Sequence, residues 1–308
     1  MIFNLSDNMN KIVVIGYPVE HSLSPAMQNA ALYDLRLENK FFYDKLEVKP
    51  SKLIDFVKRI RSREIFGANV TIPHKVSVYK LMDMVTSEAE FVGSVNTIYF
   101  EAGKIIGHST DGNGCMKAIE ENNINLYEKK VVLLGAGGAA RAIAFALTKK
   151  KANITILNRT LDKATQLCAE IKTKTNKIAK SGTLDQIKES LKDCDVLINC
   201  TSIGMKGKEE TSTLVKTSDY SKPIIVMDLV YNPIQTIFLK EAKKAGCKTI
   251  DGLAMLVYQG AESLEIWTEK KPSTAVMRRA LIDELAFLEE EQKYLEKNNM
   301  LPKKNKKK

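Results

Sequence analysis

The sequence predicts an α/β protein in which a mainly parallel α/β unit is followed by a doubly wound sheet. Three observations predict this class. Short β-rich runs alternate with amphipathic helical runs along most of the chain. The length of 308 residues suits two domains, because one domain usually spans about 150 residues. A glycine-rich turn between an apolar strand and an Ala-rich helix lies near the middle of the chain.

The composition excludes a disordered, fibrous or disulfide-stapled protein, because 44% of the residues are hydrophobic and 27% are charged. The five cysteines are scattered and the three histidines offer no metal-ligand spacing, so we expect no metal and a reducing cytoplasm. The most apolar window, Val131–Leu147, is shorter than the about 20 residues of a membrane span and contains Arg141. The first residues do not resemble a secretory signal, so we expect no membrane segment.

The charge is concentrated at the end of the chain. There are 47 basic and 37 acidic residues, a net charge of +10, and five of the lysines lie in residues 303–308. This run has no apolar residue to anchor it, so we expect residues 299–308 to form a disordered, solvated tail. The tail also lacks aromatic residues that stack on bases, which argues against nucleic acid as a partner.

The first unit is predicted to contain strands at Ile12–Ile15, Phe41–Tyr43 and Ala68–Thr71, with helices at Pro25–Leu35 and Ser51–Arg61. Because strands and helices alternate, these strands are expected to form a parallel sheet. A short helix beginning at Pro73 is followed by a hairpin of two strands, Val95–Phe100 and Lys104–His108, around Ala102-Gly103. The hairpin adds an antiparallel edge, and the unit is expected to span residues 1–111.

A helix over Gly112–Asn122 leads into the second unit, which is expected to span residues 112–252. Its six predicted strands suit a doubly wound sheet: Val131–Leu134, Asn153–Leu157, Lys177–Ala179, Val196–Cys200, Ile224–Asp228 and Lys248–Ile250. Residues 253–298 are predicted to be helical, with one break at Pro272 and no strand of their own. We expect these helices to pack back on the first unit.

The strongest chemical signal is the glycine turn, Gly135-Ala136-Gly137-Gly138-Ala139-Ala140. It matches G-x-G-x-x-A between a strand and a helix, the context that a dinucleotide-binding fingerprint requires. Gly135 permits the tight turn, Gly137 lets a pyrophosphate approach the backbone, and free N–H groups at the helix start favour an anion. The second unit is therefore predicted to be a Rossmann-type dinucleotide-binding domain. The alternative is a glycine turn without a ligand.

The end of the next strand indicates the type of dinucleotide. Asn158-Arg159-Thr160 stands where a fold specific for NAD would place an acidic residue on the ribose hydroxyls. Arg159 offers a planar fork to a 2′-phosphate, and Asn158 and Thr160 add neutral donors. NADP is therefore preferred over NAD, the alternative being that Arg159 is an ordinary solvated charge.

A second set of polar residues follows the strands of the first unit. Ser22 and Ser24 stand before Pro25 at a helix start, where Ser24 is a natural N-cap and the two hydroxyls together can donate to a carboxylate. Asn69 and Thr71 lie at the exit of another strand. Each of these residues taken alone also has an ordinary structural explanation.

Lys75 is unusual in the first turn of the helix that begins at Pro73, because the helix dipole disfavours a cation there. Lys75 either extends into water or is held for a purpose. Asp111 precedes a helix, where an N-cap is the ordinary explanation, and Asn96 and Gln259 are unremarkable individually. Histidine titrates near neutrality, so His74 is a second candidate proton donor. Adjacent helical residues point about 100° apart, so only one can face a given group, and Lys75 is favoured.

Together these motifs resemble the shikimate dehydrogenase family. They follow the family's order from residue 12 to about 290 and are H-S-L-S-P at 21–25, N-V-T-I-P-H-K at 69–75, G-S-V-N-T at 93–97, S-T-D-G at 109–112, G-A-G-G-A at 135–139, N-R-T at 158–160, N-C-T-S-I-G-M at 199–205, D-L-V-Y-N-P at 228–233 and D-G-L-A-M-L-V-Y-Q at 251–259. Ser109 departs from the family, which usually has asparagine there, so the hydrogen bonding behind Asp111 is in question.

The resemblance implies reduction of 3-dehydroshikimate to shikimate by NADPH, with Lys75 and Asp111 as the catalytic pair. It implies that Ser22, Ser24 and Tyr231 hold the substrate carboxylate, and that Asn69, Thr71, Asn96, Asp111 and Gln259 contact the ring hydroxyls and the carbonyl. It also implies that the cofactor is bound by the glycine turn, by residues 158–160, and by Thr201, Gly252 and Met255. Two alternatives stay open: an NAD-dependent quinate or shikimate dehydrogenase, and a non-catalytic protein that binds NADP or shikimate. The chain is expected to be a monomer or a homodimer.

Overall fold

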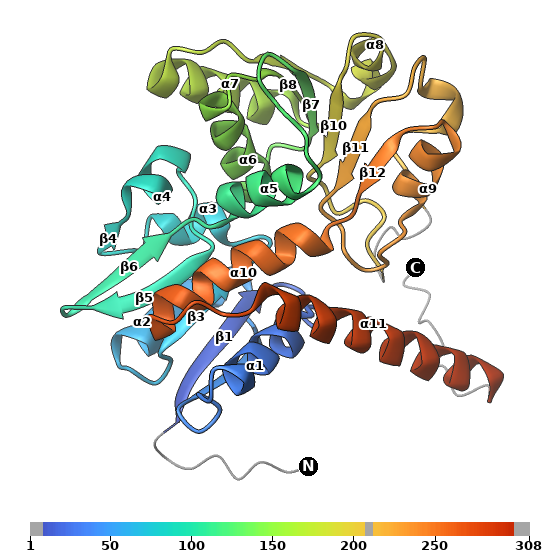
Figure 1. Cartoon of the computed structure of the whole chain (residues 1–308). Helices are drawn as coiled ribbons and strands as arrows, with labels where there is room; N and C mark the ends of the chain where they lie inside the picture. The colour runs from blue at the N-terminus through green and yellow to red at the C-terminus, as the bar shows by residue number, and fades with distance from the viewer. Residues whose placement is uncertain (1–8, 207–211, 299–308) are drawn as a thin grey trace.

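The computed structural model describes residues 9–206 and 212–298, and the tail predicted at 299–308 lies outside the described residues. The chain forms two lobes, each built on a six-stranded sheet (Figure 1). The α/β class predicted from the sequence, with its mainly parallel first sheet and doubly wound second sheet, is confirmed.

The first lobe contains a mixed sheet with the strand order β2-β1-β3-β5-β6-β4. Its elements are β1 (Asn10–Gly16), α1 (Ser24–Asp34), β2 (Phe41–Glu47), α2 (Leu53–Arg61), β3 (Gly67–Val70), α3 (Lys75–Tyr79), β4 (Met84–Val85), α4 (Ser87–Val92), β5 (Thr97–Glu101) and β6 (Lys104–His108). β1 pairs in parallel with both β2 and β3, and the hairpin of β5 and β6 adds the antiparallel edge that the sequence predicts.

The second lobe contains a sheet whose strand pairs are all parallel, with the order β12-β11-β10-β7-β8-β9. Its elements are α5 (Asp111–Glu121), β7 (Lys130–Leu134), α6 (Gly138–Lys149), β8 (Asn153–Leu157), α7 (Leu161–Thr175), β9 (Lys180–Gly182), α8 (Ile187–Leu191), β10 (Val196–Asn199), β11 (Ile225–Asp228), α9 (Ile237–Lys244) and β12 (Lys248–Ile250). Strands β8 and β9 are added on one side of β7 and strands β10 to β12 on the other, so the strand order switches between β7 and β10. Doubly wound sheets bind ligands at such a switch point.

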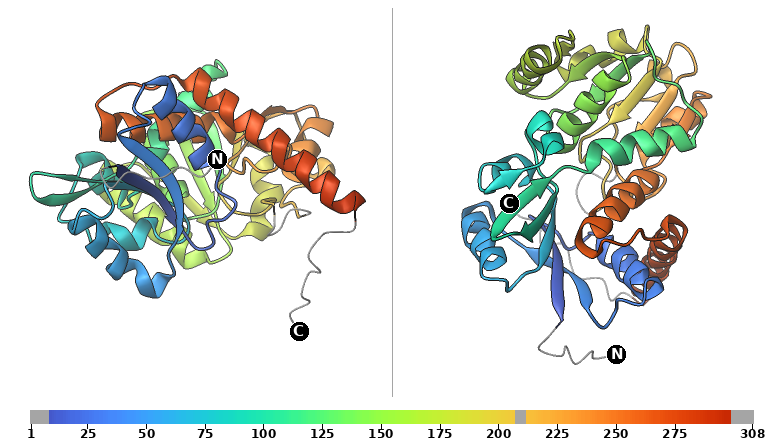
Figure 2. Two further views of the ribbon diagram at one scale, coloured as in Figure 1. Left: turned by 90° about the horizontal axis from the view of Figure 1, so that it is seen from below. Right: turned by 60° about the vertical axis from the view of Figure 1, so that its left-hand side comes forward.

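The last two helices, α10 (Leu253–Thr268) and α11 (Thr274–Lys297), return to the first lobe. α10 passes between the lobes against α5, and α11 packs on α1 (Figures 1 and 2). Trp267 on α10 donates a hydrogen bond to the carbonyl oxygen of Ile98 at 3.0 Å, which ties α10 to the first sheet.

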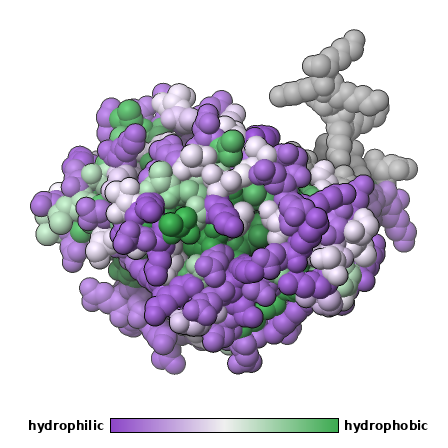
Figure 3. Space-filling view, turned by 90° about the horizontal axis from the view of Figure 1, so that it is seen from above, coloured by the Kyte–Doolittle hydropathy of each residue, from purple (hydrophilic) through white to green (hydrophobic). Residues whose placement is uncertain are grey.

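The buried residues of β1 alternate between two cores, as expected for a strand covered on both faces. Ile12 and Val14 join the core formed with α1, α10 and α11, whereas Val13 and Ile15 join the core formed with α2. The outer surface in the view of Figure 3 is mostly hydrophilic, with hydrophobic residues in small patches. Within the ranges 9–206 and 212–298, no helix is both long and apolar enough to span a membrane.

Three local predictions differ from the structure. The strand predicted at Lys177–Ala179 is wrong, because α7 ends at a left-handed Asn176 and β9 pairs with β8 only from Lys180 onward. The short elements β4 and α4 are not predicted by the sequence, since two and six residues are too few for a periodic pattern. The helix expected from Pro73 begins two residues later, so Lys75 is its first residue.

Candidate active site

The polar residues singled out from the sequence meet at one edge of the first sheet. β1 and β3 end at this edge, and the antiparallel β5 begins there. Ser22 follows β1, Lys75 follows β3 and Asn96 precedes β5, so one sheet edge collects residues that are far apart in the chain. α5 and α10 close the edge from the second lobe's side.

Lys75 and Asp111 form a buried ion pair at this edge. Lys75 Nζ lies 2.5 Å from Asp111 Oδ2, and the two side chains are 14% and 4% exposed. Each is the first residue of its helix, α3 and α5 respectively. The start of α5 favours the carboxylate through the helix dipole, so Asp111 is stabilised as an anion that can hold the ammonium. Of the two alternatives for Lys75, the structure shows a held side chain rather than one extended into water.

The Asn96 amide supports Asp111 from the other side. Its Nδ2 lies 2.8 Å from Thr110 Oγ1, 3.0 Å from Asp111 Oδ1 and 3.2 Å from Gln259 Oε1. An amide nitrogen carries only two protons, so it cannot donate fully to all three acceptors. The contact with Gln259 Oε1 is the longest of the three and so the weakest. Gln259 Oε1 is therefore the oxygen that can most readily accept a hydrogen bond from a ligand hydroxyl instead.

The Asn69 amide is engaged at both ends by protein groups. Its oxygen accepts a hydrogen bond from the Tyr43 hydroxyl at 2.7 Å, and its nitrogen lies 3.0 Å from the Ser263 hydroxyl and 3.1 Å from the Asn96 carbonyl. Asn69 is also only 6% exposed. This amide therefore braces the sheet edge, and its predicted contact with a ligand hydroxyl stays a prediction. Thr71, just beyond it, is partly exposed.

The two serines after β1 do not cap α1. The N-cap position is Leu23, and Ser24 is the first helical residue, so the prediction that Ser24 is the N-cap is wrong. The Ser22 hydroxyl, one residue before this N-cap, accepts a hydrogen bond from the Ser24 N–H at 3.3 Å. Ser24 itself is buried, with 6% exposure.

Two phenols lie beside these serines. Burial raises the pKa of Tyr231, an effect that its contact with Ser22 opposes. Burial likewise raises the pKa of Tyr43, and its contact with Ser24 opposes that shift. Both phenols thus stay protonated at neutral pH. Tyr43 donates its one proton to Asn69 Oδ1, so Tyr231 is the phenol that suits a carboxylate.

His74 is directed to another part of the fold. It is 1% exposed, and its Nε2 lies 2.6 Å from the Val48 carbonyl oxygen. A carbonyl only accepts hydrogen bonds, so this nitrogen carries a proton and donates it to Val48. The ring therefore secures the loop after β2 instead of joining the Lys75–Asp111 pair.

Ser109 is buried with 2% exposure, and among the described residues its hydroxyl has no hydrogen-bond partner. The support for Asp111 comes instead from Asn96, whose Nδ2 donates to Asp111 Oδ1. Thr110 holds Asn96 in turn, because its N–H donates to Asn96 Oδ1 at 2.8 Å. Ser109 is thus not needed to hold the carboxylate.

The glycine turn of the second lobe touches this site directly. Gly135 has a φ of 109°, which favours glycine, and a Cβ at this position would lie 3.3 Å from Thr201 Cγ2. A Cβ at Gly137 would meet nothing within 4 Å, so open space lies above this residue at the start of α6. A Cβ at Gly138 would lie 2.6 Å from Lys75 Cβ. The turn therefore has room for a pyrophosphate at one glycine and contacts the candidate proton donor at the next.

The remaining predicted cofactor residues lie around the same end of the second sheet. Arg159 and Thr160 are exposed, and Asn158 Nδ2 donates to the Thr160 carbonyl at 2.9 Å. Gly252 approaches the Leu229 carbonyl so closely that a Cβ there would lie 2.6 Å from its oxygen. Met255 follows in the first turn of α10 and is buried. Residues 158–160 follow β8 and Gly252 follows β12, so the predicted residues lie at the carboxyl ends of strands on both sides of β7, where a doubly wound sheet can bind a dinucleotide.

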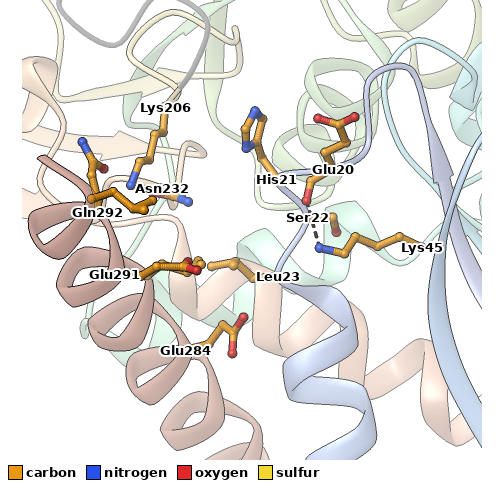
Figure 4. Close-up of a pocket in the computed structure, with 12 residues that line it drawn as sticks. Glu20, His21, Ser22, Leu23, Lys45, Lys206, Asn232, Glu284, Glu291 and Gln292 are labelled. Atoms are coloured by element: carbon orange, nitrogen blue, oxygen red, sulfur yellow. Dashed lines mark hydrogen bonds between the residues drawn. The ribbon is translucent and has the colours of Figure 1, made fainter. Parts of the chain in front are cut away.

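A cavity of about 320 Å³ lies next to Ser22 and is bounded by α11 (Figure 4). Ser22 lines it from the loop after β1, Lys206 and Asn232 from loops of the second lobe, and Glu284 and Glu291 from α11. Neither Lys75 nor Asp111 lines this cavity, so it is separate from the ion pair.

Sequence reasoning missed two residues that organise the site. Ser263 is fully buried and contacts Asn69, Thr97 and Thr110 with its hydroxyl. Its position four residues after Gln259 on a helix places both on one face, which is a usable signal. Tyr43 lies in β2 beside two phenylalanines, and its sequence context gives no such signal.

Comparison with known proteins identifies related chains. Residues 14–98 match the shikimate dehydrogenase substrate binding domain, residues 117–254 match the family described as shikimate / quinate 5-dehydrogenase, and residues 252–282 match the shikimate 5'-dehydrogenase C-terminal domain. A shikimate dehydrogenase (NADP(+)) of Methanococcus maripaludis is 43% identical over 278 residues, which cover 89% of this chain and 98% of the relative.

Solved structures give the same result. A crystal structure of shikimate dehydrogenase in complex with NADP+ is similar with a TM-score of 0.85 and 44% identity, covering 91% of this chain and 97% of that one. The shikimate 5-dehydrogenase of Thermus thermophilus, in complex with NADP(H) and shikimate, has a TM-score of 0.79 and 33% identity, covering 89% of this chain and 99% of that one.

Proposed function

This chain belongs to the shikimate dehydrogenase family, and from that premise we propose that it catalyses the reversible reduction of 3-dehydroshikimate to shikimate by NADPH. One observation carries the proposal. The buried Lys75–Asp111 pair belongs to the polar edge of the first lobe, and the Lys75 side chain lies against Gly138 in the dinucleotide turn of the second lobe. A proton donor and a hydride source are thereby brought to one carbonyl group.

The cofactor side of the proposal rests on the glycine turn and the start of α6. The N–H groups at this helix start would hold the pyrophosphate, and the exposed Arg159, with Asn158 and Thr160, would hold the 2′-phosphate. Thr201, Gly252 and Met255 are assigned to the nicotinamide end. NADPH, when bound, supplies the hydride that adds to the carbonyl carbon.

Lys75 supplies the proton. In the reductive direction its ammonium donates a proton to the carbonyl oxygen as that oxygen gains charge, so ketone, hydride and one proton give the alcohol. Asp111 holds the ammonium with Oδ2 and is itself held at Oδ1 by Asn96. In the oxidative direction the neutral amine accepts the hydroxyl proton. Both groups touch the reacting centre in this scheme and are its catalytic residues.

The substrate side assigns two groups of contacts. Ser22, Ser24 and Tyr231 donate hydrogen bonds to the substrate carboxylate. The ring hydroxyls are contacted by Thr71, Asn96, Asp111 and Gln259. In the complex, Gln259 Oε1 accepts a hydrogen bond from the substrate in place of its long contact with Asn96. Asn69 is predicted to belong to the same group, and its braced amide favours a supporting role.

The organisation of the chain forms part of the proposal. We assign residues 1–111 to the substrate-binding domain and residues 112–252 to the NADP-binding domain, and the packing of α10 and α11 on α1 supports their place with the former. All five cysteines are free, which supports a cytoplasmic location. Sedimentation of the purified chain would distinguish a monomer from a homodimer.

A steady-state comparison of four reactions tests the proposal: shikimate and quinate, each with NADP+ and with NAD+. We expect the highest kcat/KM for shikimate with NADP+. A preference for NAD+ or for quinate would instead indicate the related quinate or shikimate dehydrogenase. Tight binding of NADPH and shikimate without any turnover would indicate a non-catalytic binding protein.

A further inference from the structure

Arg141 is the one charged residue in the most apolar window of the sequence, and the proposed reaction gives it no role. It lies on α6 three residues after Gly138, and its side chain leaves the second lobe to reach α4 of the first lobe. Its Nε and Nη2 lie 3.1 and 3.0 Å from the Val92 carbonyl oxygen, and Nη2 also bonds to Glu170 on α7. The side chain is only 12% exposed.

The carbonyl end of α4 is held by cations of the second lobe. Lys174 Nζ donates to the carbonyl oxygens of Glu90 and Phe91 at 2.8 and 3.0 Å, next to the Val92 carbonyl that Arg141 holds. These last carbonyls of a helix have no partner within the helix and carry partial negative charge, so they favour cations. Phe91 of α4 also packs edge-to-face on Phe145 of α6, with ring centroids 4.8 Å apart, so α4 and the second lobe are joined by an apolar contact as well.

The backbone that follows α4 carries the active site. Gly93 ends the helix at a φ of 72°, and a Cβ there would lie 2.8 Å from Arg141 Nη2, so glycine is needed for this approach. Val95 N–H then donates to the Lys75 carbonyl oxygen at 2.9 Å, and the Asn96 side chain bonds to Asp111. A shift of Val92 would therefore move Lys75 and Asn96 together.

We propose that Arg141 is a positioning residue that couples the cofactor helix α6 to the Lys75–Asn96 edge of the substrate lobe. The inference rests on the proposed function and deepens it. A dinucleotide phosphate bound at the start of α6 would restrict the position of that helix. Because Arg141 of α6 is hydrogen-bonded to the Val92 carbonyl, the position of residues 92–96 would be restricted as well. Binding of the cofactor thus orders the substrate site, and by thermodynamic reciprocity the substrate strengthens cofactor binding by the same factor.

The coupling can be measured in a complex that cannot react. NADPH and shikimate are both in the reduced form, so the dissociation constant of NADPH can be measured by calorimetry with and without saturating shikimate. We expect shikimate to tighten NADPH binding in the unaltered chain by about tenfold, within the usual range of site-to-site coupling. In Arg141→Ala we expect less than about a threefold effect.

Lys149→Ala is the matched control. Lys149 also lies on α6 and bridges the lobes through an ion pair with Glu88 at 2.8 Å, but it is 52% exposed and does not contact the backbone before Asn96. The control should keep the coupling of the unaltered chain. If Lys149→Ala loses coupling as Arg141→Ala does, general contact between the lobes is responsible and the inference is wrong.

Arg141→Lys covers the case in which the alanine variant does not fold. Lysine keeps the charge but cannot place two N–H groups on one carbonyl while holding Glu170, so coupling should fall by at least threefold. Full coupling in the variant that folds, or none in the unaltered chain, would overturn the inference. A chain that does not oxidise shikimate with NADP+ would contradict the proposed function instead, and the binding assay separates these outcomes.

Discussion

Replacing Lys75 by methionine tests the proposed proton transfer directly. Methionine keeps most of the volume of the lysine side chain and removes the proton donor. Loss of a placed general acid lowers kcat by about 10² to 10⁴, which is about 3 to 5 kcal/mol in the activation barrier. NADPH binding should be nearly unchanged, since the phosphate contacts lie on the second lobe.

The same substitution has a calculable effect on stability. Lys75→Met leaves the carboxylate of Asp111, which is 4% exposed, without its cation. Breaking one side of a buried pair costs about 3 to 5 kcal/mol, but Asn96 still donates to Oδ1 at 3.0 Å and the start of α5 offsets about 1 kcal/mol. We expect a net loss of about 2 to 4 kcal/mol. The double variant Lys75→Met with Asp111→Asn removes the unpaired charge and should recover most of this loss without recovering turnover.

The assay pairs NADPH oxidation with 3-dehydroshikimate, followed by absorbance, with urea unfolding of the same samples. A single variant that retains kcat within tenfold of the unaltered chain would show that the proton comes from another group. A double variant less stable than the single one would refute the account of the unpaired carboxylate.

Three further predictions concern other parts of the molecule. Burial raises the pKa of Asp228 from 3.8 to about 6, so its contribution to stability is present below pH about 4 and is lost as pH rises through about 6. Asp228→Asn should remove that pH-dependent part, about 3 kcal/mol, and urea unfolding in which both chains vary equally with pH would contradict this. Arg159→Gln should raise KM for NADP+ by about 10- to 100-fold and leave KM for NAD+ nearly unchanged, whereas equal changes would exclude a 2′-phosphate contact. Gly138→Ala should lower kcat by about 10- to 100-fold because its Cβ displaces Lys75, whereas Gly137→Ala should raise KM for the cofactor, and equal kcat values in the two variants would contradict the placement.

The sequence is sufficient to predict most strands of the two sheets, because most strand-forming runs in this chain are apolar and bounded by clear turns. The hairpin turn Ala102-Gly103 has φ angles of 48° and 80°, the conformation that a two-residue hairpin loop requires. The position predicted for β9 is wrong because Ile178 looks like a strand residue, yet it is 75% exposed and only the pairing with β8 fixes where the strand starts. Pairing is a tertiary property that local patterns do not contain.

For the site, the residue types were predictable but their hydrogen bonds were not. Ser24 illustrates the difference, since Ser-Pro at a helix start is typical of an N-cap and the helix nevertheless begins at Ser24 itself. The engagement of the Asn69 amide by Tyr43 and Ser263 depends on side chains 26 and 194 positions away. Such contacts arise only after the sheet and α10 have assembled.

The return of α10 and α11 to the first lobe has a consequence for synthesis on the ribosome. The core around Ile12 and Val14 includes Leu253, Leu264 and Leu281, so its partners are translated after the whole nucleotide-binding sheet. The lobe that emerges first therefore acquires its complete core last. During translation the face of β1 that carries Ile12 and Val14 therefore stays without these partners until α10 and α11 have been made.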